Sequence, residues 1–285
     1  MNGEAVAGSR SGWLTAGALL LVMLVMYAAL LLPDDTISWL LKEERPLEGV
    51  GAVGLLIASF LAFLLWRHER RAGGPRWRTL ACLGLAILFF VAFGEEISWG
   101  QRIFGWGTPE SLRELNDQGE TNLHNLYTAD TNFLFQVFWL VMGVLIPLAA
   151  LYEPARRRLV RLVPILPIPL VVVFLANQAV IKIADRVFAA HPGLYDGTKY
   201  SVAYGLVEIK ESVVQLAFAA AFGLLYLRVQ EGRSALSKVR VGHAESALPS
   251  PDRRDLRPRG AGRAARLRAR FQRARPERGG RARAR

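Results

Sequence analysis

Six long apolar segments constrain this chain of 285 residues more than any other feature. A helix that crosses a bilayer needs about 20 consecutive, mostly apolar residues. The segments that approach or meet this length are 13–32, 49–66, 80–98, 133–152, 162–181 and 207–227. The sequence therefore predicts an all-α, polytopic membrane protein, with a bundle of six transmembrane helices in residues 1–231.

Two of these segments have features that affect how they are interpreted. The first is longer than the apolar region of a signal peptide, and no small-x-small cleavage site follows it before Pro33. We therefore expect it to remain in the protein as a span. The fifth begins with Pro164, Pro167 and Pro169, and proline lacks the N–H group that a helix needs. We expect an irregular start to that span.

The positive charge is concentrated at the C-terminal end. The chain has a net charge of +12, and residues 251–285 contain fourteen Arg and three acids, a net of +11. Residues 232–285 are rich in Arg, Ala, Pro and Gly and poor in large apolar groups, which predicts a disordered, basic cytoplasmic tail. Anionic lipid head groups are its expected partner, and no sequence-specific binding to nucleic acid is expected.

The distribution of Lys and Arg among the loops predicts the orientation. Arginines cluster after the second and fourth segments, at residues 67–78 and 156–161, and Lys and Arg follow the sixth. The loops on the other side are acidic or mixed in charge. These patterns predict a multi-pass protein of the bacterial inner membrane with both termini in the cytoplasm and residues 95–131 outside.

The outer loop, residues 95–131, is too long and too polar for a simple connection. Thr108, Pro109 and Glu110 have the pattern of a helix start, with an N-cap, a first-turn proline and a first-turn acid. Glu120 and His124 are spaced so that they meet if their segment is helical. We therefore expect a structured outer loop.

Acidic residues gather at one predicted depth, close to the outer membrane boundary. Ionisable residues inside a membrane usually face a bundle interior or a wet cavity and mark function. The candidate catalytic residues are Glu95, Glu96, His124, Glu208 and Glu211. The candidate substrate-binding residues are Arg102, which would steer an anionic head group, and Trp99, Gln101, Asn116, Gln118, Glu120, Asn125, Tyr204 and Gln215. Glu95, Trp99 and Arg102 share a helical face, so Arg102 is a candidate partner that holds Glu95 inside the bundle.

Two kinds of chemistry suit these residues. The five candidate catalytic residues, carboxylates and an imidazole, have the ligand types that bind a divalent metal ion, and they also suit general acid and base catalysis. The chain contains no HExxH, GxSxG, P-loop or CxxC motif, and its single cysteine, Cys82, excludes an intrachain disulfide. The identity of any cofactor stays open.

The strings EEISWGQR (95–102) and ETNLHN (120–125) resemble a motif pair of uncharacterised bacterial polytopic membrane proteins. That resemblance covers about thirty residues and implies no known activity. A weaker likeness connects the chain to alkaline ceramidase-like membrane hydrolases, which also combine acids, a serine and histidines near one membrane face. This chain departs from them, because it has six predicted spans rather than seven and no HxxxH motif in the last one.

The leading functional hypothesis is an enzyme, a hydrolase or transferase, that acts on a lipid or lipid-linked substrate at the outer face of the membrane. One alternative is a proton- or ion-coupled transporter, in which the intramembrane acids form a relay. Another is a non-catalytic membrane scaffold whose loop binds a second membrane protein. For the enzyme, we expect Glu95 or Glu96 to lie near Glu208 or Glu211, with His124 folded over them.

Overall fold

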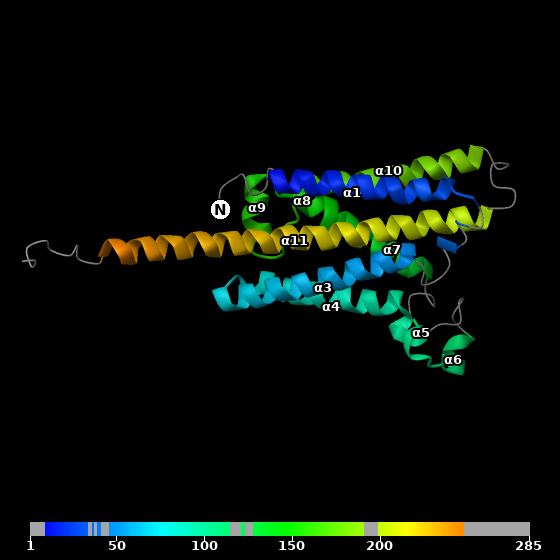
Figure 1. Ribbon diagram of the computed structural model, residues 1–285, viewed down its shortest axis with the longest axis horizontal. Helices are drawn as coiled ribbons and strands as arrows, with labels where there is room; N and C mark the ends of the chain where they lie inside the picture. Colours follow the sequence, from blue (N-terminus) through cyan, green and yellow to red (C-terminus); the bar gives the residue numbers. More distant parts are fainter. Residues whose placement is uncertain are drawn as a thin grey trace, which may run out of the picture. The chain divides into compact units, whose positions relative to one another are not determined.

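A computed structural model describes residues 9–33, 36, 39–40, 46–114, 121–122, 128–190 and 199–247. Within these residues every regular element is a helix (Figure 1). The chain divides into two compact units, Met1–Gly232 and Arg233–Arg285. The membrane-length helices and the candidate site lie in the first unit.

Five described helices are long and apolar enough to cross a membrane: Arg10–Leu31, Gly49–Ala72, Arg76–Glu96, Thr131–Ala149 and Gly205–Gly232. They confirm the predicted membrane character and agree with five of the six predicted segments. The elements that contain them are α1 (Arg10–Ala28) with the short turn η2 (Ala29–Leu31), α3 (Pro46–Ala72), α4 (Arg76–Glu96), the composite helix α7 (Thr128–Trp139), η4 (Leu140–Leu145) and α8 (Ile146–Ala149), and α11 (Lys199–Ala247).

The fifth predicted segment differs from the expected 162–181. Its helix, α10, is Pro169–Ala190, and residues 164–167 have no regular structure. The apolar part of α10, Pro169–Ala184, is shorter than the other five. Each proline removes a backbone donor and keeps the residue before it out of the helical region, so the helix starts only at the last of the three. The expected irregular start is confirmed.

The long helices run alternately up and down the first unit. At one end, the Arg78 backbone N–H donates to the Arg161 carbonyl at 3.2 Å, and the Arg228 guanidinium donates to Ser9 Oγ at 3.5 Å. We call this the basic end, because the arginine-rich turns lie there. The end where α4 finishes at Glu96 is called the acidic end. Figure 1 shows α1 beside α10 and α3 beside α4.

An aromatic layer fills the core between the two ends. Phe218 of α11 packs against Phe89, Phe138 and Phe174, with ring centroids 5.2–5.4 Å apart. Phe89 also contacts Phe222 at 5.5 Å. Four of these five phenylalanines, Phe89, Phe174, Phe218 and Phe222, are fully buried. The layer comes from four different helices and therefore fixes their relative positions.

A π-helical turn, η4, interrupts the fourth long helix next to this layer. It brings Gly143 so close to Phe174 that a Cβ would lie 2.9 Å from the ring. Trp139, just before the turn, stacks on the same ring with centroids 6.2 Å apart. The wider turn and the missing side chain together admit a full aromatic ring between α10 and the composite helix.

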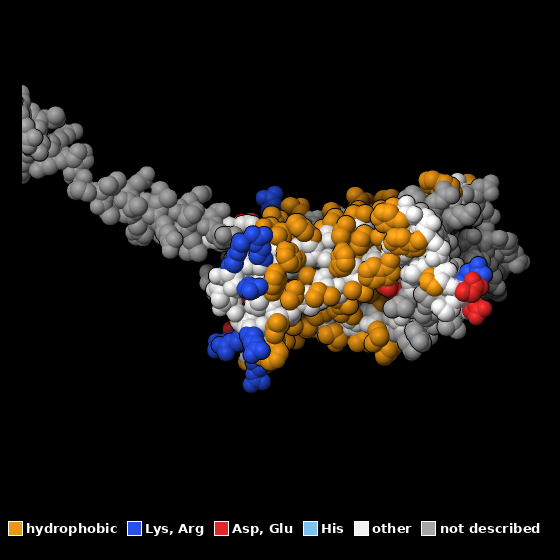
Figure 2. All heavy atoms as spheres, turned by 90° about the horizontal axis from the view of Figure 1, so that it is seen from below, with side chains coloured by type: hydrophobic (Ala, Val, Ile, Leu, Met, Phe, Trp, Pro, Cys, Tyr) orange, Lys and Arg blue, Asp and Glu red, His pale blue; other side chains and the backbone are white. Residues whose placement is uncertain are grey.

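Apolar side chains also cover the outside of the first unit. Figure 2 shows them across the middle of the molecule, with Lys and Arg gathered at one end. Large apolar residues of the described helices, such as Leu14, Leu21, Phe60, Ile87 and Phe133, are exposed. A soluble monomer rarely exposes so much continuous apolar surface, so this belt agrees with the membrane character of the helices.

The last helix extends farther than the sequence predicted. α11 continues to Ala247, although the disordered tail was expected from residue 232. Residues 233–247 include Ala, Leu, Lys and Arg, which favour helix. Residues 248–285 lie outside the described residues, so disorder and lipid binding of the tail stay predictions.

Candidate functional site

A tight left-handed turn follows α4 at the acidic end. Ser98 has φ 46°, Trp99 has φ 54° and Gly100 has φ 76°. This region costs a residue with a side chain about 1–2 kcal/mol, and only Gly100 adopts it without strain. Non-glycine residues in such conformations cluster at functional sites. The strain at Ser98 and Trp99 is therefore the first structural sign of function in the EEISWGQR string.

The turn folds the Trp99 ring back onto α4. A Cβ at Gly94 would lie 2.8–2.9 Å from three atoms of that ring, so the position beneath it accepts only glycine. The indole Nε1–H donates to Glu95 Oε1 at 2.8 Å. The continuous helical face that was to join Glu95 to Arg102 does not form, because the left-handed turn interrupts it. The Arg102 side chain lies outside the described residues.

Side chains join the two halves of the motif pair. Asn122 Nδ2 donates to Ser98 Oγ at 3.1 Å, and both residues are buried. Gln101 Nε2 donates to Thr108 Oγ1 at 2.7 Å, and Gln101 Oε1 accepts the Thr121 backbone N–H at 2.7 Å. The strings that stand apart in the sequence therefore form one braced unit. The expected short helix is also present as α6 (Glu110–Arg113).

Glu96, the last residue of α4, is connected to α11. Gln215 Nε2 donates to Glu96 Oε1 at 2.7 Å, and Gln215 is 3% exposed. Gln215 itself is held against α3, where a Cβ at Gly51 would overlap Gln215 Oε1 and lie 3.0 Å from Ser212 Cα. Three helices thus meet at this junction, and the absence of a side chain at Gly51 allows them to do so.

A second hydrogen-bonded connection runs through α1, α10 and α11. The Tyr27 hydroxyl donates to Asn177 Oδ1 at 2.8 Å, and Asn177 Nδ2 donates to the Lys210 carbonyl at 2.8 Å. Asn177 is 1% exposed. The next residue along, Glu211, has a carboxylate oxygen 3.5 Å from Lys210 Nζ. Since Glu211 and Gln215 are one helical turn apart, the two connections are neighbours on α11.

The described candidates thus gather at one end of the bundle. Glu95, Glu96, Glu208 and Glu211 are half-buried, Gln101 is half-buried, Trp99 is 40% exposed and Gln215 is buried. Five other candidates lie outside the described residues: Asn116, Gln118, Glu120, His124 and Asn125. For Arg102 and Tyr204, only the side chains lie outside them. The separation of the carboxyl groups and the position of His124 stay predictions.

A divalent metal site was the open question about cofactors. Among the described residues, no group of three or more His, Cys, Asp or Glu side chains is placed to hold a metal ion. Of the five candidate ligands, His124 lies outside that set. A metal site that includes His124 stays a prediction.

The candidate site residues selected from the sequence did not include Tyr27, Asn177, Lys210, Ser212 and Gly51. The outer half of the fifth predicted segment contains Asn177, Gln178, Lys182 and Asp185, and the spacing of 178, 182 and 185 predicts that these three share one helical face. Gln178 is half-buried, Lys182 is exposed, and the Asp185 side chain is outside the described residues, whereas Asn177 is fully buried. The spacing from Leu170 through Phe174 and Asn177 to Ile181 is that of a buried helical stripe. That spacing was the signal that would have located Asn177.

The chain was compared with protein-family models, curated proteins and solved structures, and none of them matches it. The resemblances based on the motif pair and on the ceramidase-like hydrolases stay predictions. Function is therefore inferred from the geometry of the acidic end.

Proposed function

We propose that the protein is a membrane-embedded enzyme, a hydrolase or transferase, that acts on a lipid or lipid-linked substrate at the outer face of the membrane. The observation that carries this proposal is the junction at the acidic end. The buried Gln215 of α11, which packs against Gly51, donates a hydrogen bond there to the half-buried Glu96 of α4, and the half-buried Glu211 lies one helical turn from Gln215. In the proposed orientation, this junction would lie at the depth where lipid head groups meet hydrocarbon.

The chemistry assigned to the junction is general acid and base catalysis. One carboxyl group, Glu96 or Glu211, takes a proton from an attacking water or alcohol, and the other returns a proton to the leaving group. Lys210, with Nζ 3.5 Å from Glu211, offsets negative charge that forms on the reacting carbonyl or phosphoryl group. Glu95, bound by the Trp99 indole, belongs to the strained turn that would contact the substrate head group.

The aromatic layer favours an enzyme over a transporter. A proton relay needs polar groups from one face to the other. One or two helical turns below Gln215, Asn177 and Glu96, the core consists of the buried phenylalanines described above. Apart from Ser59, whose hydroxyl donates to the Ala86 carbonyl, the described buried polar side chains lie on the acidic side of this layer, which suits a substrate that enters and leaves at one side.

The proposal includes six spans with both termini in the cytoplasm. α10 has 22 residues, or about 33 Å at 1.5 Å per residue, which is close to the thickness of the hydrocarbon core. The arginine-rich turns would face the cytoplasm. Reporters fused after Arg71 or Arg158 should respond as cytoplasmic, and one inserted at Gly119 as external. An internal signal at Gly119 would reverse the orientation and move the site to the other leaflet.

A non-catalytic scaffold is the second candidate, and the hydrogen bonds themselves favour it. Polar side chains that pair across helices hold membrane bundles together, each contributing about 0.6–2 kcal/mol. The connections from Tyr27 through Asn177 to α11 and from Gln215 to Glu96 are of this kind. In a scaffold, their removal would lower stability and change nothing else.

Glu211→Gln and Glu96→Gln separate the two candidates. The purified full chain is reconstituted in vesicles that contain lipids with ester, amide and phosphodiester bonds, and lipid turnover is followed by mass spectrometry together with the thermal midpoint. For the enzyme, we expect turnover to fall at least 100-fold with little loss of stability. Glu110→Gln, in the exposed pair with Arg113, is the matched control. Loss of stability in the two variants, with no turnover by the wild type, would favour the scaffold.

A further inference from the structure

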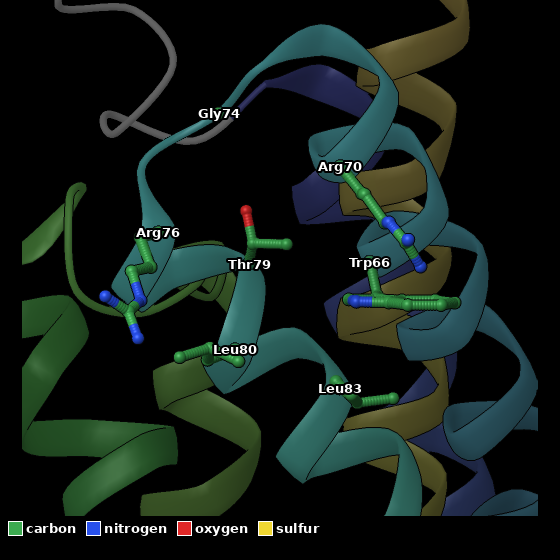
Figure 3. Close-up of a pocket in the computed structure, with 7 residues that line it drawn as sticks. All are labelled: Trp66, Arg70, Gly74, Arg76, Thr79, Leu80 and Leu83. Carbon is green, nitrogen blue, oxygen red and sulfur yellow. The ribbon is translucent and has the colours of Figure 1, made fainter.

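A second polar site lies at the basic end, in an open pocket of about 420 Å³ between the end of α3 and the start of α4. Figure 3 shows Trp66 and Arg70 on the α3 side and Arg76, Thr79, Leu80 and Leu83 on the α4 side, with Gly74 in the connecting turn. The volume is within the range of pockets that hold small ligands. None of these residues takes part in the junction at the acidic end.

The pocket has an apolar floor and a cationic rim. Trp66, Leu80 and Leu83 form the floor, whereas Arg70 and Arg76 stand on opposite sides of the opening. The Arg70 guanidinium lies over the Trp66 ring, 5.5 Å from its centroid. A ligand that fits this lining carries a negative charge on one part and hydrocarbon on another.

Charge pairing distinguishes the pocket arginines from their neighbour Arg78. Arg78 Nη2 lies 3.1 Å from Glu69 Oε1, and this acid is thereby neutralised beneath the turn. Among the described residues, neither Arg70 nor Arg76 forms an ion pair. Two guanidinium groups therefore remain available at the mouth of the pocket for an anion, and guanidinium binds phosphate oxygens well.

Two glycines form the turn above the pocket. Gly73 has φ 67°, which suits glycine, and a Cβ at Gly74 would overlap the Glu69 carboxylate. The turn N–H of Gly74 donates to the Glu69 carbonyl at 2.8 Å. Side chains at these two positions would either strain the turn or displace the carboxylate that holds Arg78.

The surroundings are those of a membrane interface. Trp77 is 64% exposed beside the pocket, and its ring lies 5.9 Å from the Arg76 guanidinium. Tryptophan is enriched where a membrane-spanning helix meets the head groups. Exposed Leu80 then leads from the pocket onto the apolar belt. We propose that this pocket binds the phosphate-bearing head group of an anionic membrane lipid, with one acyl chain lying along Leu80 and Leu83.

The proposal is tested with the full chain in neutral detergent by native mass spectrometry. Phosphatidylglycerol is titrated against Arg70→Gln/Arg76→Gln and against Arg67→Gln/Arg71→Gln. The second pair removes equal charge from exposed positions on α3 that do not line the pocket. We expect the pocket pair to weaken binding of the first lipid about 10- to 30-fold, and the control pair to weaken it no more than about threefold. Equal losses in both pairs would overturn the proposal.

Further measurements test whether the ligand is a lipid or a free anion. They also test whether weaker binding comes from the pocket itself or from misfolding. Phosphatidylcholine should bind at least tenfold more weakly than phosphatidylglycerol, and inorganic phosphate or glycerol 1-phosphate should not compete at the lipid concentrations used. Competition at those concentrations would overturn the lipid assignment. Leu83→Trp keeps every charge but fills the floor, and we expect it to weaken binding as much as the arginine pair does. Unchanged binding in a folded Leu83→Trp protein would contradict the site.

Discussion

The two ends of α4 are held by different physical means. At its start, Arg78 pairs with Glu69 and also binds the 160–161 segment, and the left-handed residue of the preceding turn is a glycine. At its end, Glu95 and Glu96 accept hydrogen bonds from the neutral donors Trp99 and Gln215. At that end, Ser98 and Trp99 adopt the left-handed conformation, and so does Gly100.

The difference is that residues with side chains adopt the left-handed conformation at the end of α4, whereas a glycine does so before its start. A buried charge is stable when an opposite charge and hydrogen bonds compensate it, and a left-handed turn is unstrained when glycine occupies it. The start of α4 meets both conditions. At the end, Ser98 and Trp99 carry side chains in left-handed conformations, and such a cost persists where the surrounding structure holds a site in position. The predictions below test this contrast.

The largest effect is expected at the glycine that admits Gln215. Gly51→Val should lower the free energy of unfolding by about 3 kcal/mol, because the added atoms overlap Gln215 and approach the α11 backbone. Gly49→Val is the matched control, since a Cβ at Gly49 meets nothing within 4 Å. Thermal unfolding in detergent measures both. Equal stabilities would show that α3 does not press on α11 at this point.

The next effect is expected at the start of α4. Arg78→Gln should cost about 2 kcal/mol, between the values for exposed and buried ion pairs, because the Arg78 and Glu69 side chains are only 20% and 12% exposed. Arg157→Gln is the control, since Arg157 is 76% exposed in its pair with Glu153. A double-mutant cycle with Glu69→Gln gives the coupling. A coupling energy near zero would show that the Arg78–Glu69 pair does not stabilise the start of α4.

A smaller effect is expected in the turn after α4. Gly100→Ala should destabilise the protein by about 1 kcal/mol, because φ is 76° at Gly100. Gly107→Ala, where a Cβ meets nothing and φ is not in the left-handed region, should change little. Hydrogen exchange of residues 98–104 and the thermal midpoint report the change. If Gly100→Ala is neutral, the turn is not strained as described.

The smallest effect concerns pH at the basic end. Hydrogen bonds from Arg157 and Arg156 lower the pKa of Glu153 at the start of α9 (Glu153–Leu159). A lowered pKa in the folded state contributes stability above the unfolded-state pKa, and this stability is lost as pH falls through the folded-state pKa. Because Glu153 is exposed, the change should be slight. Hydrogen exchange of α9 should show it, and Glu153→Gln should abolish it.

Hydropathy predicted the helices well because burial in lipid demands long apolar segments. It misplaced the start of α10 because leucine, valine and isoleucine around Pro164 and Pro167 count as apolar whether or not they are helical. The sequence favoured a turn at residues 99–102, but it did not predict the left-handed conformation of Ser98 and Trp99. Left-handed conformations are rare outside Gly, Asn and Asp, so tertiary packing must impose this one.

The sequence indicated which candidate residues share one depth, but it did not indicate which residues they contact. Glu95, Glu96, Glu208, Glu211 and Gln215 were selected because polar groups at one depth need a shared environment. Their partners depend on side-chain size and direction across helices. Whether Glu96 meets Gln215 depends on the missing Cβ at Gly51, a residue with no chemistry of its own. Local spacing within one helix does not contain that information.

The proline segment before α10 has a consequence for the order in which the membrane domain assembles. Residues 164–167 lack helical hydrogen bonds, and Pro164, Leu166 and Pro167 are buried. Irregular backbone at membrane depth is tolerated only when protein surrounds it. α10 also lies along α1, where Pro169 faces Gly12 and Asn177 binds Tyr27. We therefore expect α1 to insert into the membrane before α10 during biogenesis. Insertion of α10 should be late and should require α1.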